Sequence, residues 1–432
     1  MNAVANGVRP LPTNVKPGAM EYGYWAFLAI AIGRVGELVP GLGSVPLGKM
    51  ALALPLFLAL TRRKELPALA AQARPLARNG MWLAAIAVVL TPFSVWAGAS
   101  RVFLLQELPV LISTVILAYV MCRSWRTVRG TLVALVFSGL ILARAALSAY
   151  TGGRAATDTM YDTNDLAYLL VTVFPLSVGF LITSKTRLWW VINAGIGAIL
   201  LGALLLTQSR GGLLGLAAVV AGLIFMPIKA RESGSTKKGP NRFLLLLGVL
   251  GLSVVVWSQL PPAARERFAT VLDLGNDYNL DPNNNTSRGQ IWTRGVHATL
   301  ARPIGYAPRT FNMVEWKYGG QFYAPHNSIV QAMVELGVPG LFLFLRMYYL
   351  AWRGLQRSRR NLLTRQSLSN EQQDQLVFAR ILQVSLVGNI VAGFFLSMAY
   401  ANLLWTTFGI CMALMAIAAR DDTPVGTPAS TT

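Results

Sequence analysis

The sequence is divided into apolar runs of about 20 residues, separated by short polar breaks. A run of about 20 apolar residues forms a helix that crosses the roughly 30 Å hydrocarbon core of a bilayer. Twelve runs can be marked along the 432 residues, at 22–39, 45–60, 81–97, 102–121, 130–150, 165–184, 188–207, 211–228, 243–260, 327–350, 376–399 and 403–419. The pattern predicts an all-α polytopic membrane protein with about 12 transmembrane helices.

Charge supports this class and excludes an ordinary soluble enzyme. Only 13% of the residues are charged, against about a quarter in soluble domains. The net charge of +20 would favour nucleic-acid binding in a soluble chain, but here the sidedness of the membrane has to be considered first. The two cysteines, Cys122 and Cys411, cannot form a disulfide framework and are not placed to hold a metal.

Basic residues collect in alternate loops, as the positive-inside rule requires of cytoplasmic flanks. One side carries Arg62, Arg63, Lys64, Arg74, Arg78, Arg123, Arg126, Arg129, Lys185, Arg187, Lys229, Arg231, Lys237, Lys238, Arg242, Arg353, Arg357, Arg359, Arg360 and Arg365. The short loops of the opposite side hold only Arg101, Arg154 and Arg210. Both termini are therefore expected in the cytoplasm, and the charge is explained by topology and attraction to membrane lipids, without a nucleic-acid partner.

One long external loop interrupts the short connections and divides the chain. We expect nine transmembrane helices over 1–260, the loop at 261–326, three more helices over 327–419 and a cytoplasmic tail at 420–432. Long loops are usually functional or disordered. This one predicts short helices at 261–272 and 287–300, separated by an Asn/Asp-rich tract, whereas 353–375 reads as a solvated hairpin between helices.

Motifs for metal or nucleotide chemistry are absent from the sequence. It has no Walker loop, no paired-cysteine spacing and no His-Glu-x-x-His helix. The run 277–281 imitates the start of a calcium loop, but Pro282 replaces the turn glycine and Arg288 stands where the bidentate Glu belongs. No external Asp-x-Asp pair could clamp a metal-bound diphosphate. We therefore predict a site without metal or cofactor.

Two arginines stand at predicted helix starts on the external side. Ser209 and Ser287 are candidate N-caps, and Arg210 and Arg288 follow them at the first helical position. A cation there opposes the helix dipole unless an anion is shared by the guanidinium and the free backbone N–H groups. The pair favours a diphosphate site, although arginines that anchor loops or reach to the membrane interface are the alternative for each one alone.

Both histidines of the chain fall in the external loop. His326 directly precedes the predicted tenth transmembrane helix, where the positive end of the dipole would keep its imidazole neutral and able to act as a general base. A histidine that merely caps the helix is the alternative. His297 is expected to be a packing or solvent-facing residue.

The ordered set of motifs resembles the O-antigen ligase and polymerase superfamily. It comprises Ser209-Arg210-Gly211-Gly212, Ser287-Arg288 with Trp292, Arg302-Pro303-Ile304-Gly305-Tyr306, His326-Asn327-Ser328 and Glu335-Leu336-Gly337-Val338-Pro339-Gly340. Asn164-Asp165-Leu166-Ala167 also resembles a motif of the superfamily. The likeness covers the number and order of the helices, the single large loop and most of residues 160–345.

The resemblance implies a GT-C-type glycosyltransferase of the Gram-negative inner membrane, with its site facing the periplasm. Its donor would be an undecaprenyl-diphosphate-linked glycan and its acceptor lipid A-core. Arg210 and Arg288 would bind the diphosphate, and His326 would be the catalytic base of an inverting, metal-independent transfer. Arg265 and Arg309 are secondary candidates for donor or core-phosphate contacts, and Glu335 and Gly337 would position the tenth helix.

Two kinds of alternative remain open. An O-antigen polymerase or a protein O-oligosaccharyltransferase would use the same donor with another acceptor, although the compact loop favours the ligase. A transporter or flippase would also explain twelve helices. Transporters usually place charged residues or broken helices near the membrane midplane. Arg34, Arg144, Arg346 and Arg380 come nearest to this, and no acid within the helices clearly pairs with them.

Overall fold

The computed structural model describes most of the chain as helix. The described residues are 16–39, 41–156, 162–226, 247–248, 251, 254–255, 257–258, 262–269 and 281–420. The ninth predicted run at 243–260, the run 277–281 that imitates a calcium loop and the two tails lie wholly or mostly outside them. Within these residues the chain forms helices, turns and loops without a strand, which confirms the all-α prediction.

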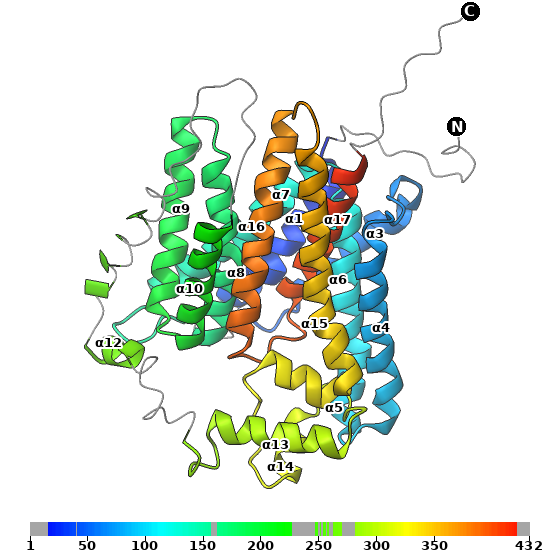
Figure 1. Ribbon diagram of the computed structural model, residues 1–432, viewed down its shortest axis with the longest axis vertical. Coiled ribbons are helices and arrows are strands. Elements are labelled where there is room, and N and C mark those ends of the chain that lie inside the picture. Colours follow the sequence, from blue (N-terminus) through cyan, green and yellow to red (C-terminus); the bar gives the residue numbers. More distant parts are fainter. Residues whose placement is uncertain are drawn as a thin grey trace, which may run out of the picture.

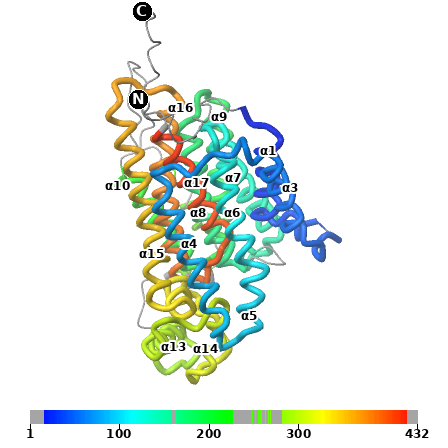
Figure 2. Tube along the Cα trace, turned by 90° about the vertical axis from the view of Figure 1, so that its right-hand side faces the viewer, coloured from blue at the N-terminus to red at the C-terminus, as the bar shows by residue number. Residues whose placement is uncertain are grey.

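The helices run upright and close together, with a short helical layer across one end (Figure 1). They are α1 (Ala19–Ile32), α2 (Val35–Leu38), α3 (Leu47–Thr61), α4 (Arg74–Leu90), α5 (Ala97–Val102), α6 (Leu108–Met121), α7 (Trp125–Ser148), α8 (Thr163–Ile182), α9 (Arg187–Leu206), α10 (Arg210–Phe225), α12 (Pro262–Ala269), α13 (Arg288–Ala301), α14 (Phe311–Lys317), α15 (Ser328–Leu363), α16 (Asn370–Gly393) and α17 (Asn402–Arg420). Figure 2 shows from the side that α13 and α14 cover one end of the bundle, which we call the α13 end.

The predicted runs that lie in the described residues form helices, except that the first is divided in two and the eleventh, 376–399, leaves the helix after Gly393. In the described part of the chain, eight helical segments are long and apolar enough to span a bilayer, and α1, α3 and α10 are shorter apolar helices. The first run is not one helix as predicted, because the chain turns at Arg34, whose φ of 49° is left-handed, between α1 and α2. The run predicted at 102–121 starts earlier, since α5 continues into α6 through a π-helical stretch, Phe103–Glu107.

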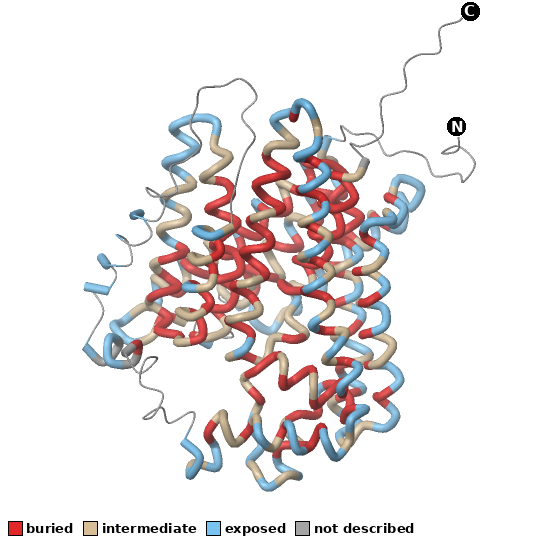
Figure 3. Tube along the Cα trace, viewed as in Figure 1, coloured by how far each residue is buried: buried red, intermediate tan, exposed pale blue. Residues whose placement is uncertain are grey.

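The outer surface of the bundle is apolar, as a membrane requires. Figure 3 shows buried residues concentrated in the middle of the bundle and exposed ones along the outer helices α9 and α4. The exposed residues include Leu188, Trp189 and Trp190 on α9 and Met81 and Trp82 on α4, each at least half exposed. Contiguous apolar faces of this kind mark contact with lipid or another chain. Together with the helix lengths, they establish a polytopic membrane protein.

The long helix α15 is broken at Gly337, and another segment takes up the hydrogen bonds that the break releases. Gly337 has φ 72° and ψ −174°, and Pro339 has no N–H to give the carbonyl of Glu335. Instead, Ala307 N–H donates to Glu335 at 2.9 Å and Tyr306 N–H donates to Val334 at 3.0 Å. Val338 N–H in turn donates to the carbonyl of Pro303 at 2.8 Å.

Two of the motifs therefore fit together backbone to backbone. The Arg302–Tyr306 motif docks on the Glu335–Gly340 motif, and a Cβ on Gly305 would meet Gly337 N at 2.4 Å. The contact bends α15, so that its first segment lies beneath the bundle and the rest runs up through it (Figure 1). The break thus fixes the direction in which α15 starts, and with it the position of the residues before its first turn.

Replacing Gly337 by alanine is expected to destabilise the protein by more than about 1 kcal/mol. The added Cβ would meet the Pro303 carbonyl oxygen at 2.4 Å, and the backbone conformation is one that only glycine adopts readily. Thermal unfolding of the purified protein measures the effect. Gly319→Ala is the control, because φ is 87° there but nothing lies within 4 Å. Equal unfolding temperatures for the two variants would contradict the close contact.

Candidate functional site at the α13 end

Four helices begin with a side-chain cap at or next to the α13 end. Asp162 caps α8, Ser209 caps α10, Ser287 caps α13 and Asn327 caps α15, each side chain accepting from a backbone N–H of its first turn. This confirms the two predicted serine caps. Helix N-termini carry partial positive charge and free N–H groups, so their convergence favours an anion.

The Ser209-Arg210-Gly211-Gly212 motif lets α10 start in close contact with two other helices. A Cβ on Gly211 would meet the Cβ of Phe395, after the end of α16, at 2.7 Å, and one on Gly212 would meet the Cβ of Ala167 in α8 at 2.6 Å. Ser209 Oγ accepts from Gly212 N–H at 3.2 Å. Only glycine allows these approaches, which place the half-buried Arg210 where α8, α10 and α16 meet.

A loop before α8 fixes the same helix start from the other side. Arg154 donates from Nε to the carbonyl of Thr207 at 3.1 Å and from Nη2 to Asn164 Oδ1 at 3.1 Å. Gln208 Nε2 donates to the carbonyl of Gly153 at 2.7 Å. The Asn164 motif singled out in the sequence therefore holds the turn between α9 and α10 in register with α8.

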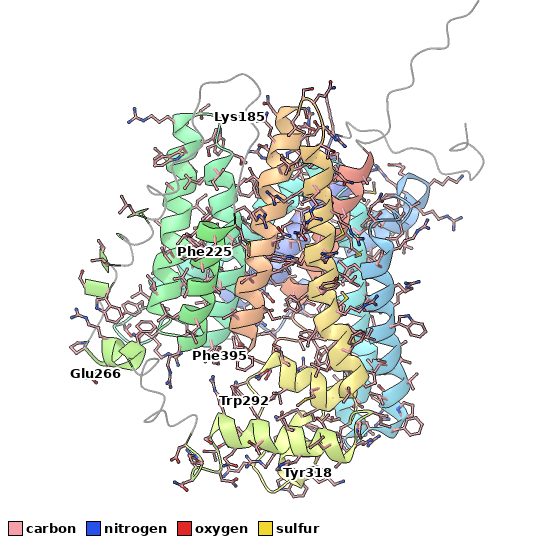
Figure 4. The ribbon with its side chains drawn as sticks, in the orientation of Figure 1. Lys185, Phe225, Glu266, Trp292, Tyr318 and Phe395 are labelled. Atoms are coloured by element: carbon pink, nitrogen blue, oxygen red, sulfur yellow. The ribbon has the colours of Figure 1, made fainter. Side chains whose placement is uncertain are left out.

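Arg288 lies at the start of α13. One turn later in this helix, Trp292 contacts the bundle and fixes α13 against it. Trp292 Nε1 donates to the carbonyl of Pro325 at 2.8 Å, and its ring packs edge-to-face on Phe394 at 5.3 Å. Figure 4 shows Trp292 and Phe395 at the junction of α13 with the bundle. Like Arg210, Arg288 is half-buried at the first position of its helix.

His326 is held in a left-handed conformation, with φ 45°, just before α15. The backbone N–H of His326 donates to Ser397 Oγ at 3.0 Å. Ser328 Oγ, two residues later, donates to the carbonyl of Leu396 at 2.7 Å and accepts from Met398 N–H at 2.8 Å. Histidine is one of the few non-glycine residues enriched in this conformation. The start of α15 is therefore clamped to the chain that follows α16.

The 394–397 segment, which follows α16, contacts the elements that carry all three candidate residues. The sequence did not reveal this role. Phe394 contacts Trp292 on α13, Phe395 contacts Gly211 beside Arg210, and Ser397 holds His326. Arg210, Arg288 and His326 thus all lie on elements that pack on four consecutive residues. Nothing in the local pattern of 394–397 marks this role, because it arises from packing between distant segments.

Arg288 and Asp162 lie close enough to His326 for their charges to change its pKa. Burial lowers the pKa of His326 below its ordinary value of 6.5, the positive charge of Arg288 lowers it further, and the negative charge of Asp162 raises it. A lowered pKa keeps the imidazole neutral near pH 7, as a general base requires. Asp162 was missed in the sequence. Its position directly before Thr163, as an N-cap, was the available signal.

The remaining residues singled out in the sequence do not contact the 394–397 segment through any hydrogen bond described below. Arg309 donates from Nε and Nη2 to Glu107 Oε2, at 3.0 and 2.6 Å, near the start of α6. Arg265 is exposed on α12, where Nη2 donates to the carbonyl of Ser258 at 2.8 Å. His297 is exposed, as expected. Glu335 is buried and accepts from Tyr400 O–H at 2.8 Å, away from the 394–397 segment.

An apolar groove lies between α10, the first turn of α15 and the end of α16. We call it the α10–α16 groove; it is lined by Leu214, Ile329, Ile390, Val391, Phe394 and Phe395 and has a volume of about 410 Å³. Leu214 follows Arg210 by one helical turn and Ile329 follows His326 by three residues. In the described part of the chain, no group of three or more His, Cys, Asp or Glu stands together as metal ligands would. The site therefore combines cations, a neutral imidazole and an apolar wall.

Replacing Asp162 by asparagine is expected to shift the acidic limb of the pH–rate profile to lower pH. Without the carboxylate, the pKa of His326 falls, and a base that acts in its neutral form then works at lower pH. Asparagine still caps α8, so the helix start is kept. Transfer rates measured across the acidic range test this. Glu266→Gln, at an exposed carboxylate on α12, is the control, and a limb that stays in place in Asp162→Asn would contradict the interaction.

Residues 195–345 match the model of a protein family described as O-antigen ligase. The matched stretch begins in α9 and ends in α15, so it contains Arg210, Arg288 and His326. No curated protein matches the chain.

Proposed function

We propose that this chain, whose residues 195–345 match the O-antigen ligase family, is a member of that family and joins a polysaccharide carried on undecaprenyl diphosphate to lipid A-core. It would act in the inner membrane of a Gram-negative bacterium, with the α13 end in the periplasm and both termini in the cytoplasm. The reaction would be an inverting glycosyl transfer that needs no metal. The basic loops between the helices at the opposite end support this orientation.

A single observation carries the proposal. Two arginines at capped helix starts and a histidine of lowered pKa lie on elements that pack on the 394–397 segment. Arginine binds phosphate oxygens through paired N–H groups, and helix N-termini add backbone donors and favourable dipoles. Arg210 and Arg288 would therefore bind the diphosphate of the donor.

The lipid part of the donor has a place next to this position. The α10–α16 groove is apolar, and its lining includes Leu214, four residues after Arg210, and Ile329, three residues after His326. A prenyl chain is an extended hydrocarbon, and an apolar groove stabilises it by keeping its surface away from water. We place the part of the undecaprenyl chain nearest the diphosphate in this groove, with the rest in the bilayer.

The geometry supports a direct displacement. His326 would take the proton from the acceptor hydroxyl, and that oxygen would attack the anomeric carbon of the donor sugar. The bond from this carbon to the diphosphate oxygen breaks, and undecaprenyl diphosphate leaves with the electron pair. Arg210 and Arg288 would stabilise the negative charge that develops on it. Attack opposite the leaving group inverts the anomeric centre.

The acceptor distinguishes the ligase from its relatives, since an O-antigen polymerase or a protein O-oligosaccharyltransferase would use the same donor. The test supplies purified protein with lipid-linked glycan and either lipid A-core, a second lipid-linked repeat or a protein acceptor. We expect product with lipid A-core, also in the presence of a chelator. Product with another acceptor alone would refute the ligase assignment, and loss of activity with the chelator would refute the metal-independent reaction.

A further inference from the structure

A second apolar cavity lies on the other side of the first segment of α15. We call it the α4–α6 slot; it has a volume of about 380 Å³ and is lined by Ala77 and Ala84 of α4, Leu111 and Val115 of α6, Leu336 of α15 and Met412 of α17, among others. The volume falls within the usual range for ligand pockets. Along α6 the lining runs from Leu108 to Val120, a length of about 18 Å. The shape suits an extended hydrocarbon chain.

The slot opens sideways, towards the position of the bilayer. Its lining includes Met81 on α4 and Ile112 and Ile116 on α6, whose side chains are 63%, 42% and 51% exposed. The slot lies between two successive spanning segments: α4, which packs on α15, and α6, which packs on α17. A lipid chain could enter from the membrane without crossing a polar surface.

The inner end of the slot reaches the elements that carry the candidate site. Ala332 and Leu336 belong to the first segment of α15, and Ala399 and Tyr400 follow the 394–397 segment. The Tyr400 ring packs on Phe103 at 4.6 Å. The α10–α16 groove lies at Ile329 and Phe394, on the same two stretches of chain. Two apolar sites therefore flank the start of α15, as a reaction between two lipid-anchored substrates requires.

The end of the slot nearest α13 is positively charged. The connection between α4 and α6 meets the 302–310 stretch there, with Ser100 Oγ donating to the Pro308 carbonyl at 2.7 Å. Arg302 donates to the carbonyl of Phe93 at 3.0 Å, Arg309 pairs with Glu107, and Arg101 is exposed. Residues 91–107 and 302–310 together contain these three arginines and one acid, and the buried carboxyl of Glu335 also acts on Arg309, so the excess positive charge comes from Arg101 and Arg302. This balance favours a lipid whose headgroup carries phosphate.

We infer that the α4–α6 slot binds an acyl chain of the phosphorylated lipid acceptor, with the headgroup phosphate at the arginines near its α13 end. The inference rests on the proposed function, in which both substrates are lipids. It separates the two anchors: the donor chain lies on the α10 side of the α15 start and the acceptor chain on the α4 side. The glycan of the acceptor would then extend across the α13 end towards His326.

Filling the slot tests the inference. Ala84→Phe places a ring in the slot, whereas Ala85→Phe, one residue along α4 and outside the lining, is the matched control. We expect Ala84→Phe to raise the KM for acylated lipid A-core about tenfold or more. Its KM for the donor and its rate with a deacylated core oligosaccharide should stay unchanged, and Ala85→Phe should behave as wild type. A higher KM for the donor instead would assign the slot to the prenyl chain and overturn the inference.

A second measurement does not depend on activity or on tolerance of a buried ring. A photoreactive residue at the exposed position Ile112 should crosslink labelled lipid A-core, and unlabelled lipid A-core should compete while phospholipid should not. Arg101→Gln should weaken this crosslink with the phosphorylated lipid only. Crosslinking of any phospholipid with equal efficiency would overturn the inference. Failure of the proposed function would appear separately, as wild-type protein that leaves lipid A-core unused.

Discussion

Replacing His326 by asparagine is expected to lower the rate of glycan transfer about 10²- to 10⁴-fold, the usual contribution of a general base. Asparagine is the better choice than alanine because the backbone at residue 326 has φ 45°, a conformation that asparagine tolerates. The N–H of the new residue still donates to Ser397, so the clamp on α15 is kept. The variant therefore removes the imidazole with little change to the fold. Rates with purified protein and lipid-linked donor measure the loss.

The matched control for this variant is the same change at the other histidine. His297→Asn lies on the exposed surface of α13 and should transfer glycan at the wild-type rate. Unfolding temperatures of both variants should match that of the wild type, which separates a chemical defect from a structural one. If His326→Asn retained nearly full activity while folding normally, the assignment of the base would be wrong.

The fold was predictable from the sequence as far as it depends on local chemistry. Apolar runs of membrane-spanning length and serine caps before Arg210 and Arg288 are short-range features, and the structure has helices where they predict them. The break in α15 was less accessible. Pro339 within an apolar run indicates a lost hydrogen bond, but not that Ala307 and Tyr306 supply the replacement donors. Such pairing joins residues about thirty positions apart.

The site divides in the same way. His326 and the two arginines were recognisable because a helix N-terminus gives such residues a physical role that can be stated from sequence. The function of 394–397 was not, because two phenylalanines, a leucine and a serine after an apolar helix are typical of ordinary packing. Asp162 lies between these cases: its cap was readable from the sequence, whereas its charge acts on His326 only through the fold. Residues that act through tertiary contacts were therefore those that the sequence did not reveal.

Replacing Arg210 or Arg288 by glutamine is expected to cost about 2–4 kcal/mol of transition-state stabilisation, or about 30- to 10³-fold in rate. Each guanidinium would offset charge on the leaving diphosphate, and glutamine removes the charge while keeping much of the side-chain volume. Lysine at either position should restore part of the rate, because it retains the charge but not the paired N–H donors. If both arginines hold one diphosphate, the double variant should lose less than the product of the single losses.

Arg187 provides the control for local structure. It occupies the first position of α9 behind the cap of Thr186, which accepts from Trp189 N–H, so it shares the capped helix start of Arg210 and Arg288, although it is exposed and they are half-buried. Figure 4 shows Lys185, two residues before Arg187, at the end of the bundle opposite α13. Arg187→Gln should therefore transfer glycan at the wild-type rate. An equal loss in all three variants would show that arginine at a helix start supports folding rather than the diphosphate. A loss confined to Arg210 and Arg288 would support their joint role at the α13 end, because both lie on elements that pack on the 394–397 segment, which also holds His326.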